Sequence, residues 1–560
     1  MRLLRVYIDG YRNLKNVTVD FDKDSLTTVV IGENGSGKSN LIEAIVEVFR
    51  AWALGQPSSL SFSYGVFYEI RGHRFELVGA SGSPILRFEN GDDAGSVQFP
   101  KATSPAYFWA SLNKELAHAL DLPTKNDFAS MMDGSWILPD LIFGYYSGSS
   151  RRLETLFDAH QSRYYGVINK ERNAAEYETA RTARRLFYCR PIHGVLALLS
   201  YLAKPGKDGD VKKLLTEKLG ITGFHSALAH FKEPSWFPGS KAAAVRETGK
   251  LWGAHGPAGA CARALKDAAF HSLELEGAVV DDYRRKTSKE AQLACFLRDK
   301  KALKAFADTY DTDQDMFAAL EAADISDLFR EMIVWVTRTN DATGDISFSD
   351  LSDGERQLLM VLGLIRVSRG KEALFLLDEP DTHLNPAWQL TYLELIREWT
   401  EVATKGEEDK CQIIMTTHNP LTIAALEAKE VRVMSSDDAG NVTVAPPRID
   451  PKGLGFAGVL TDIFGLSSSL DKPTQVKIDR RNELAREDEL TPAMAKEFAG
   501  IREELRHLGF LYEERDKLYS EFLRQLDNVE LADVEPLTPD EMRDREAESR
   551  RIVEELLSKK

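Results

Sequence analysis

The feature that most constrains this chain is a glycine-rich loop set between an apolar segment and a helical pattern. Residues 32–39 read Gly-Glu-Asn-Gly-Ser-Gly-Lys-Ser, which fits the spacing G-x-x-x-x-G-K-[ST]. Residues 26–31 predict a strand before the loop, and apolar residues at helical spacing over 41–48 predict a helix after it. This order is typical of a phosphate-binding loop, because inward-facing N–H groups and a helix N-terminus attract a polyphosphate. A dinucleotide-binding loop is disfavoured, since the glycines do not follow G-x-G-x-x-G.

Each residue of the loop therefore has an expected role in holding a nucleotide. Lys38 is expected to reach the β- and γ-phosphates, and the Ser39 hydroxyl is expected to be a ligand of Mg²⁺. A glycine-rich turn that binds nothing is the alternative, and the agreement of strand, spacing, lysine and serine weighs against it. The expected nucleotide contacts are Gly32, Glu33, Asn34, Gly35, Ser36, Gly37, Lys38, Ser39 and Asn40.

Composition limits the class of protein further. At 560 residues the chain is too long for one ordinary core, so three or four modules are expected. No stretch approaches the ~20 apolar residues of a membrane span, and the four cysteines form no C-x-x-C pair. We therefore expect a cytoplasmic protein with no membrane partner. The net charge of −16 argues against a generally basic nucleic-acid binder, so any such contact needs a local patch or a partner.

A second group of residues far downstream completes a nucleotide-hydrolysis pattern. Residues 373–377 predict a buried strand that ends in Asp378 and Glu379, which is the Walker B pattern. Asp378 is expected to hold Mg²⁺, and Glu379 is the expected catalytic base that orients the attacking water. The alternative is a strand end with two solvated acids, which the phosphate-binding loop in the same chain makes less favourable.

Two further segments carry polar residues at element ends. The segment 351–357 reads Leu-Ser-Asp-Gly-Glu-Arg-Gln before a helical pattern, with Ser352 as an N-cap and Gly354 permitting close backbone approach. Residues 412–417 predict another buried strand, which ends at His418, where the ring could contact a γ-phosphate. Taken singly, the first would be read as a plain helix cap and the second as a structural histidine.

Together these segments resemble the ABC-type ATPase superfamily. The phosphate-binding loop matches at 32–39, the signature motif at 351–357, Walker B at 374–379, the D-loop at 380–386 and the switch histidine at His418. Two departures are that Asp353 stands where transporters usually have Gly, and that residues 141–148, where the Q-loop should be, contain no Gln.

This resemblance implies ATP and Mg²⁺ as cofactors, with ATP held between two heads of a homodimer or higher homo-oligomer. Ser352 and Gly354 of one head would cap the γ-phosphate held by Lys38 of the other. The resemblance also implies nucleotide contacts from Glu355 and Asp381, and a catalytic role for His418 beside Glu379.

The predicted fold class is α/β: a P-loop ABC-type ATPase head with a helical insertion and a C-terminal helical arm. The separation between Lys38 and Asp378 exceeds an ordinary domain of about 100–150 residues, so a module lies within the head. We expect an N-terminal head lobe at 1–150, a packed helical insertion at 151–340, a C-terminal head lobe at 341–445 and a charged helical arm at 446–560, which is either solvated or a docking platform.

The N-terminal segment narrows the branch of the superfamily. Residues 10–16, Gly-Tyr-Arg-Asn-Leu-Lys-Asn, resemble the start of SMC- and RecF-like ATPases, which implies that Arg12 and Asn13 contact nucleotide. The alternative is a simple hairpin turn at the edge of a sheet.

The narrowest resemblance is to Septu-type (PtuA-like) antiphage ATPases, including retron-associated forms. It is carried by 377–386 with its unusual His383, by Tyr-Tyr-Ser-Gly at 145–148, and by 459–471. It implies an ATPase that regulates a separate effector, an HNH-type nuclease. Three other functions stay open: a RecF/SMC-like repair ATPase that binds DNA directly, an OLD-like ATPase with a degenerate nuclease domain, and a nucleotide sensor that does not hydrolyse.

Two charged features bear on nucleic acid and on cleavage. The arginines at 181, 184, 185 and 190 could touch phosphates of DNA or of a retron RNA or DNA, but we favour pairing with local acids. Asp437 and Asp438 lie in a glycine-containing turn without the Glu that a nuclease metal site needs, and no HNH arrangement is present. We therefore expect no nuclease in this chain.

Overall fold

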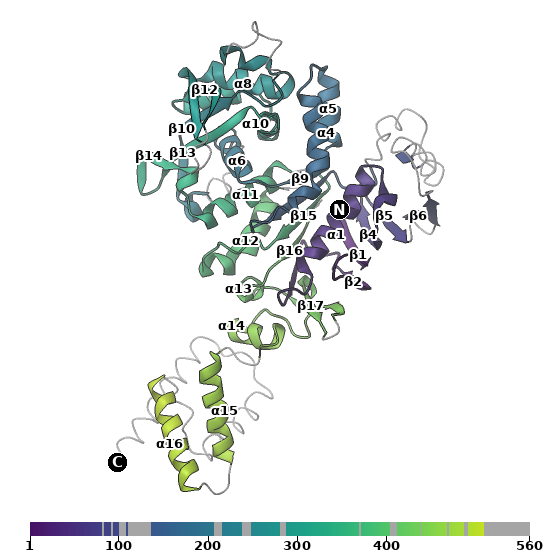
Figure 1. Cartoon of the computed structure of the whole chain (residues 1–560), viewed down its shortest axis with the longest axis vertical. Helices are drawn as coiled ribbons and strands as arrows, with labels where there is room; N and C mark the ends of the chain where they lie inside the picture. Colours follow the sequence, from purple (N-terminus) through teal and green to yellow (C-terminus); the bar gives the residue numbers. More distant parts are fainter. Residues whose placement is uncertain are drawn as a thin grey trace, which may run out of the picture. The chain divides into compact units, whose positions relative to one another are not determined.

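The computed structural model divides the chain into two compact units, Met1–Leu466 and Ser467–Lys560. The first unit contains three sheets and their helices (Figure 1). The second contains two described helices and is treated separately. The residues described are 1–80, 83–90, 93–99, 108–109, 112, 136–205, 215–237, 248–280, 287–368, 371–403, 411–437, 440–466, 470–486 and 491–508.

A seven-stranded sheet forms the centre of the first unit, in the order β18-β17-β3-β16-β15-β8-β9. All neighbouring pairs are parallel except β17 with β18. Parallel strands present their carboxyl ends at one edge, so loops from distant parts of the sequence meet there. The strands are β3 (Thr27–Gly32), β8 (Leu141–Tyr146), β9 (Leu186–Tyr188), β15 (Ala373–Asp378), β16 (Cys411–Thr416), β17 (Val431–Ser436) and β18 (Val442–Ala445).

Both faces of this sheet are buried, which explains why its strands read as continuous apolar runs. In β15, Phe375 and Leu377 face one core, while Leu374 and Leu376 face the other. The second core also contains α1 (Lys38–Ala53), and the first contains helices of the inserted module and of the C-terminal lobe. The central sheet is thus covered on both sides, as in other α/β folds.

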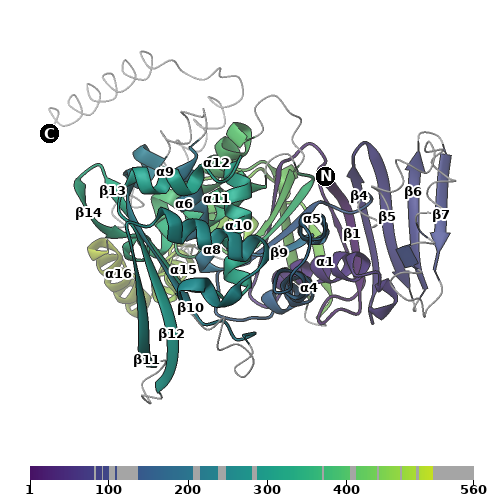
Figure 2. The same ribbon diagram turned by 90° about the horizontal axis from the view of Figure 1, so that it is seen from above.

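A separate antiparallel sheet contains the other strands of the N-terminal lobe, in the order β2-β1-β4-β5-β6-β7. Figure 2 shows its strands side by side, beyond α1. Its apolar face belongs to the same core as α1, so this sheet and the phosphate-binding helix are packed as one body. The strands are β1 (Arg2–Asp9), β2 (Val17–Asp20), β4 (Ser63–Ile70), β5 (His73–Ala80), β6 (Ser83–Asn90) and β7 (Asp93–Gln98).

The inserted module corrects one prediction, because it contains a five-stranded antiparallel sheet as well as helices. Its order is β11-β12-β10-β13-β14. The segments rich in helix formers, 181–186, 195–199 and 300–306, do lie in or beside helices. β10 mixes strand formers such as Ile221 and Phe224 with Gly, Ala and Lys, which are depleted in strands. Its pairing with β12 and β13 is made by residues distant in sequence, which no local pattern reveals. The strands are β10 (Ile221–Lys232), β11 (His271–Val280), β12 (Thr287–Leu297), β13 (Phe329–Arg338) and β14 (Asp341–Ser347).

Helices pack the module onto the central sheet, and α6 lies against α11 of the C-terminal lobe. Gly363 of α11 makes this approach possible, since a Cβ there would lie 2.6 Å from the Ala197 side chain of α6. Besides α1, the described α-helices of the first unit are α4 (Asp158–Ile168), α5 (Ala174–Ala183), α6 (Pro191–Ala203), α8 (Gly256–Ala268), α9 (Lys300–Ala307), α10 (Asp313–Ile325), α11 (Asp353–Val367), α12 (Pro386–Ala403), α13 (Pro420–Ile423) and α14 (Gly455–Gly458).

The described part of the second unit consists of α15 (Lys472–Arg486) and α16 (Pro492–His507). The two helices are joined by ion pairs, Arg480 with Glu497 at 2.8 Å and Lys477 with Glu504 at 2.6 Å. The predicted arm began at residue 446, but residues 446–466 belong to the first unit. The rest of the predicted arm, 509–560, lies outside the described residues. Among the described helices, none combines the length and apolarity needed to cross a membrane.

Candidate nucleotide-binding site

The phosphate-binding loop joins β3 to α1 as predicted, and two of its glycines are required by the geometry. Gly37 has φ of 105° and directly precedes the helix, and a Cβ there would lie 2.9 Å from the Leu14 side chain. Gly32 has φ of 154°, and its Cβ would lie 2.2 Å from the Met434 carbonyl oxygen. The first turn of α1 therefore presents free N–H groups beside an exposed loop, which is an anion-binding arrangement.

The Lys38 side chain lies against the backbone of the phosphate-binding loop. Its Nζ donates hydrogen bonds to the carbonyl oxygens of Gly32 at 2.8 Å and Glu33 at 3.0 Å. Burial lowers the pKa of the ammonium, and the nearby carboxylates of Glu379 and Asp378 oppose that effect. The charge is thus held partly desolvated at the loop, where a polyphosphate would stabilise it.

A candidate Mg²⁺ site lies where α1 meets the end of β15. The Ser39 hydroxyl donates to Oδ1 of Asp378 at 3.1 Å, and Thr416 at the end of β16 also donates to Oδ1. Burial raises the pKa of Asp378, while these two hydrogen bonds oppose the rise. A hydroxyl and a carboxylate are the oxygen ligands that Mg²⁺ takes at a phosphate-binding loop, so these residues fit that ion.

The predicted base, Glu379, and the predicted switch histidine are brought together. Glu379 has a left-handed backbone with φ of 53°, which is uncommon for a residue with a side chain. Its N–H donates to both the carbonyl and the hydroxyl oxygen of Thr416 at 3.1 Å, and these bonds hold that conformation. The His418 ring Nδ1 lies 3.2 Å from a carboxylate oxygen of Glu379. Backbone strain of this kind clusters at functional sites.

Asn13 contacts the phosphate-binding loop. Its Nδ2 donates to the Gly35 carbonyl at 2.9 Å, and its Oδ1 accepts from Asn40 at 2.6 Å. Nucleotide contact by Asn13 and Asn40 stays a prediction; in this structure the two amides brace the loop and the helix start.

Glu43 of α1 is paired with arginines from two other segments, and the sequence analysis did not predict this role. The carboxylate is buried in α1, and it pairs with Arg12 at 2.7 Å and with Arg152 at 3.0 Å. Arg152 also donates to Oδ1 of Asn40 at 2.7 Å. Arg12 is thus paired within the protein, and its expected nucleotide contact also stays a prediction. An acid at a buried position of an amphipathic helix was the signal that could have identified Glu43.

The segment expected at the Q-loop position does lie beside Walker B. β8 pairs with β15 in register, so that Tyr146 lies opposite Asp378. Directly after it, the Ser147 N–H donates to the Asp378 carbonyl at 3.2 Å, and its hydroxyl donates to Thr382 at 3.3 Å. This segment lies beside the strand that ends at Asp378, at the position where the Q-loop was expected.

The signature segment forms a reciprocal cap at the start of α11. The N–H of Ser352 donates to Glu355 at 2.8 Å, and the Ser352 hydroxyl accepts from the Glu355 N–H at 3.3 Å. Gly354 is packed against the loop after Walker B, because a Cβ there would lie 2.9 Å from the His383 carbonyl. Within the described residues, no hydrogen bond or ion pair joins this segment to the phosphate-binding loop.

Asp381 is the predicted site residue whose placement differs most from expectation. It is 1% exposed, and its carboxylate accepts hydrogen bonds from Thr417 at 2.8 Å and from Thr422. Its side chain is therefore engaged inside the protein and anchors the loop after Glu379. Nucleotide contact by Asp381 stays a prediction.

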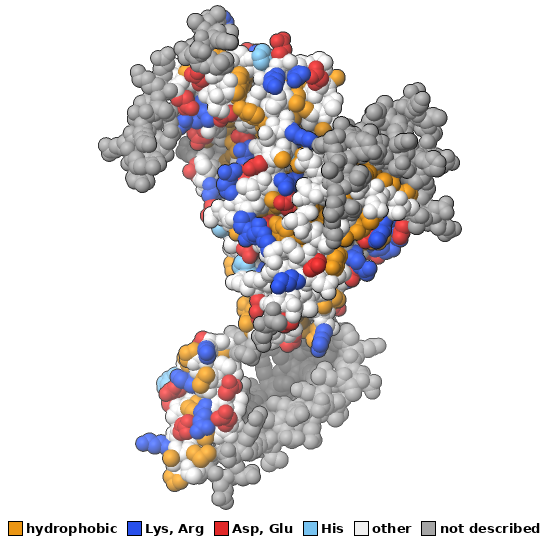
Figure 3. All heavy atoms as spheres, turned by 45° about the vertical axis from the view of Figure 1, so that its right-hand side comes forward, with side chains coloured by type: hydrophobic (Ala, Val, Ile, Leu, Met, Phe, Trp, Pro, Cys, Tyr) orange, Lys and Arg blue, Asp and Glu red, His pale blue; other side chains and the backbone are white. Residues whose placement is uncertain are grey.

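Three of the four arginines in the cluster pair with acids, which is the interpretation that the sequence analysis favoured. Arg184 lies 2.7 Å from Glu321, and Arg181 lies 2.7 Å from Glu178. Arg190 pairs with Asp324, and Arg185 donates to the Pro139 carbonyl at 2.7 Å. On the face drawn in Figure 3, basic and acidic side chains are interspersed over the described surface.

The turn that holds Asp437, which the sequence analysis did not assign to a nuclease, has a structural explanation. Its carboxylate accepts from the backbone and side-chain amides of Asn441 at 2.7 and 2.8 Å, closing the turn between β17 and β18. Asp438 lies outside the described residues.

Comparisons with known proteins agree with these features. Residues 273–424 match the family model described as "AAA domain, putative AbiEii toxin, Type IV TA system", and residues 1–53 match the model "AAA ATPase domain". The chain is 29% identical over 129 residues to the Septu protein PtuA of Bacillus mycoides (strain KBAB4), which covers 22% of this chain and 17% of that protein. It is 30% identical over 147 residues to the Septu protein PtuA of Bacillus thuringiensis, covering 23% of this chain and 34% of that protein.

Solved structures give weaker matches. The SMC head domain from Thermotoga maritima is 12% identical, with 80% of this chain and 100% of that chain covered and a TM-score of 0.29. The recombination mediator RecF bound to ATP is 13% identical, covering 75% and 92%, with a TM-score of 0.21. Because these scores are low, the fold class rests on the sheet order and the loop geometry described above.

The central sheet and the loop between β3 and α1 form an α/β P-loop ATPase head, and the family matches make residues 1–53 and 273–424 similar to AAA ATPase domains. Within that class the chain resembles the Septu protein PtuA. The matches span 17% and 34% of the length of those two relatives, so their similarity is confined to part of each protein.

Proposed function

We propose that this chain binds ATP with Mg²⁺, dimerises through two ATP-bound heads and uses slow hydrolysis to control a separate effector in antiphage defence. One observation carries the ATPase part of this proposal. Lys38, Asp378, Glu379 and His418 come from the ends of three neighbouring parallel strands and are joined there by direct contacts or by the electrostatic pairing of Lys38 with the two acids.

The roles of the chain's own residues follow from their chemistry. Lys38 and the N-terminus of α1 hold the phosphates, while Ser39 and Asp378 would hold Mg²⁺, which neutralises charge on the phosphate oxygens. Glu379 accepts the proton of the attacking water, and His418 orients that carboxylate through the 3.2 Å contact. The left-handed backbone at Glu379 fixes the direction in which the base points.

Dimerisation is proposed because the signature segment caps its own helix and has no hydrogen bond or ion pair with its own phosphate-binding loop among the described residues. Ser352 is exposed at the N-terminus of α11, and the first-turn N–H groups that the Ser352–Glu355 cap does not use would face the γ-phosphate of a second copy. Gly354 fixes this helix start against the loop that follows Glu379, which would couple the second copy's nucleotide to the catalytic base.

Replacing Ser352 with Arg is expected to abolish ATP-dependent dimers without abolishing ATP binding by each head. The long side chain occupies the helix N-terminus, and loss of the cap costs about 0.5–2 kcal/mol of stability. Light scattering after gel filtration, with ATP and in the slowly hydrolysing Glu379→Gln background, measures the dimer. Ser59→Arg, at an exposed turn, is the matched control. Persistence of ATP-dependent dimers in Ser352→Arg would contradict the two-head arrangement.

The proposed effector is a separate HNH-type nuclease, and the similarity to Septu PtuA supports a protein partner. We place the complex in the cytoplasm and assign no cleavage to this chain. The charged second unit is the proposed docking platform, because α15 and α16 belong to a compact unit of their own and the residues of the ATP site belong to the other unit.

Deleting residues 467–560 is expected to leave ATP turnover within about twofold and to remove the partner from pull-downs. The cut falls at the boundary between the two compact units, and both cores around the ATP site lie in the first unit. Turnover and co-purification from cells carrying the native operon are measured side by side. Retained partner binding would move the docking surface to the inserted module. DNA cleavage by the purified chain alone would contradict the proposal that a separate partner carries the nuclease activity.

A further inference from the structure

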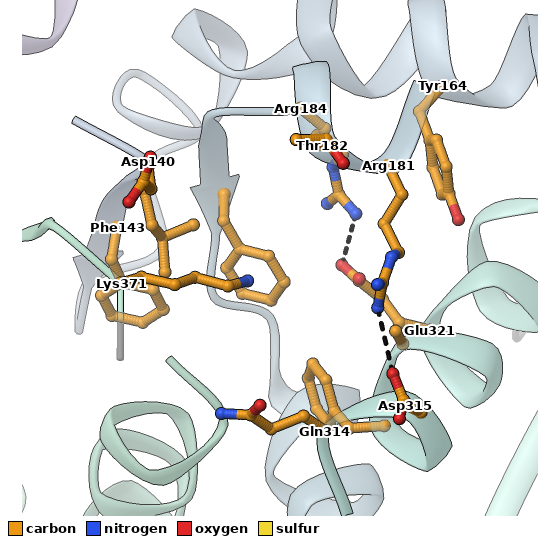
Figure 4. Close-up of a pocket in the computed structure, with 14 residues that line it drawn as sticks. Asp140, Phe143, Tyr164, Arg181, Thr182, Arg184, Gln314, Asp315, Glu321 and Lys371 are labelled. Carbon is orange, nitrogen blue, oxygen red and sulfur yellow. Dashed lines mark hydrogen bonds and ion pairs between the residues drawn. The ribbon is translucent and has the colours of Figure 1, made fainter. Parts of the chain in front are cut away.

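A cavity of about 290 Å³ lies between the inserted module and the edge of the central sheet, away from the ATP-binding residues. Figure 4 shows Arg181 and Arg184 entering it from the end of α5, and Glu321 from α10. Lys371 extends into it from the opposite side, ahead of β15. Its volume is at the small end of ligand-binding pockets, which are typically about 300–1,000 Å³.

The charges around this cavity leave one cation without a carboxylate. Arg184 pairs with Glu321 at 2.7 Å, and Arg181 pairs with Asp315 at 3.4 Å. Asp140 pairs with Arg71 on its other side. Within the described residues, Lys371 has no ion pair or side-chain hydrogen bond.

Lys371 is an exposed residue, but its surroundings still lower the pKa of its ammonium. Desolvation lowers the pKa of this ammonium, and Arg181 and Arg184 lower it further, whereas Glu321 and Asp140 act in the opposite direction. A partly desolvated cation near two other cations is stabilised by an anion.

Aromatic rings form much of the remaining lining, and they help to fix the position of Arg184. The Arg184 guanidinium lies over the rings of Tyr164 at 5.4 Å and Phe187 at 5.2 Å, so its position is fixed by rings as well as by Glu321. Phe143 and Phe317 add further ring surface. Such walls favour a flat apolar group, and the arginine and lysine favour an acidic group attached to it.

We propose that this cavity binds a small organic anion, consisting of one acidic group on a planar ring-bearing body no larger than a nucleoside monophosphate. The acidic group pairs with Lys371, and the ring lies among Tyr164, Phe187 and Phe317. The bound anion would connect α5 and α10 of the inserted module with the strand that carries Asp378.

The test measures binding directly by isothermal titration, with the ATP site filled by Mg²⁺ and a non-hydrolysable ATP analogue. The probes are AMP and benzoate, which supply a phosphate or a carboxylate on a ring, with adenosine and inorganic phosphate as the neutral and the ringless comparisons. We expect AMP or benzoate to bind at least about tenfold more tightly than adenosine or inorganic phosphate, since charge-assisted hydrogen bonds carry such differences.

Variants assign that binding to the cavity. Lys371→Met is expected to lower the affinity for the ring anion at least about tenfold, and Lys371→Arg is expected to retain most of the affinity of the unmodified chain. Lys301→Met, at an exposed position of α9, is the matched control. Thermal melts establish that each variant is folded. Equal affinity in Lys371→Met, equal binding of adenosine, or no binding of either ring anion would overturn the proposal, and none of these results bears on ATP hydrolysis.

Discussion

Replacing Glu379 with Gln is expected to reduce ATP turnover by about 10²–10⁴-fold while ATP binding is retained. The amide keeps the size of the side chain and its position after β15, but it cannot accept a proton from the attacking water. The backbone bonds from the Glu379 N–H to Thr416 do not involve the side chain, so the left-handed loop should persist. Single-turnover release of phosphate separates this chemical step from nucleotide binding and product release.

The matched control is Glu394→Gln, an exposed acid on α12 that removes the same charge away from the site. Turnover in that variant should stay within about twofold of the unmodified chain. His418→Ala adds a second comparison, because the ring only orients Glu379 at 3.2 Å and its loss should cost less than loss of the base. If Glu379→Gln turns over ATP near the normal rate, another group is the base.

Replacing Lys38 with Ala is expected to weaken ATP binding at least about 10- to 100-fold, the range that loss of one or more charge-assisted hydrogen bonds implies. The ammonium would no longer face the β- and γ-phosphates, and the loop would also lose its two bonds to the Gly32 and Glu33 carbonyls. Titration with a fluorescent ATP analogue measures the affinity.

Lys23→Ala is the control, since this lysine is exposed in the segment before β3. Lys38→Arg tests whether charge alone is sufficient, because the planar guanidinium cannot reproduce both carbonyl contacts of a compact ammonium. An unchanged ATP affinity in Lys38→Ala would remove this loop from the nucleotide site.

The sequence was most informative where function depends on a short contiguous pattern. The loop at 32–39, the strand ending at Asp378–Glu379 and the strand ending near His418 were each placed on the element that the structure shows. Apolar runs identify buried parallel strands because both faces of the sheet are covered, and glycine spacing identifies a loop because few backbones can turn so tightly.

Patterns of helix formers were less informative within the inserted module. Runs rich in Ala, Leu and Lys do form helices there, but β10, which mixes strand formers with Gly, Ala and Lys, pairs with β12 and β13. Strand pairing depends on partners distant in the sequence, so local propensity could not separate this strand from a helix.

By itself, the sequence determined that a glycine-rich loop joins a strand to a helix, and that the predicted metal ligand and the predicted base stand at the end of a buried strand. Only the tertiary structure decided that Glu43 links Arg12 and Arg152, that Asp381 is buried against Thr417, and that Lys371 enters a cavity without an ion pair among the described residues. The physical reason is that a motif specifies local backbone geometry, whereas burial and ion pairing depend on which distant segments the packed sheet brings together.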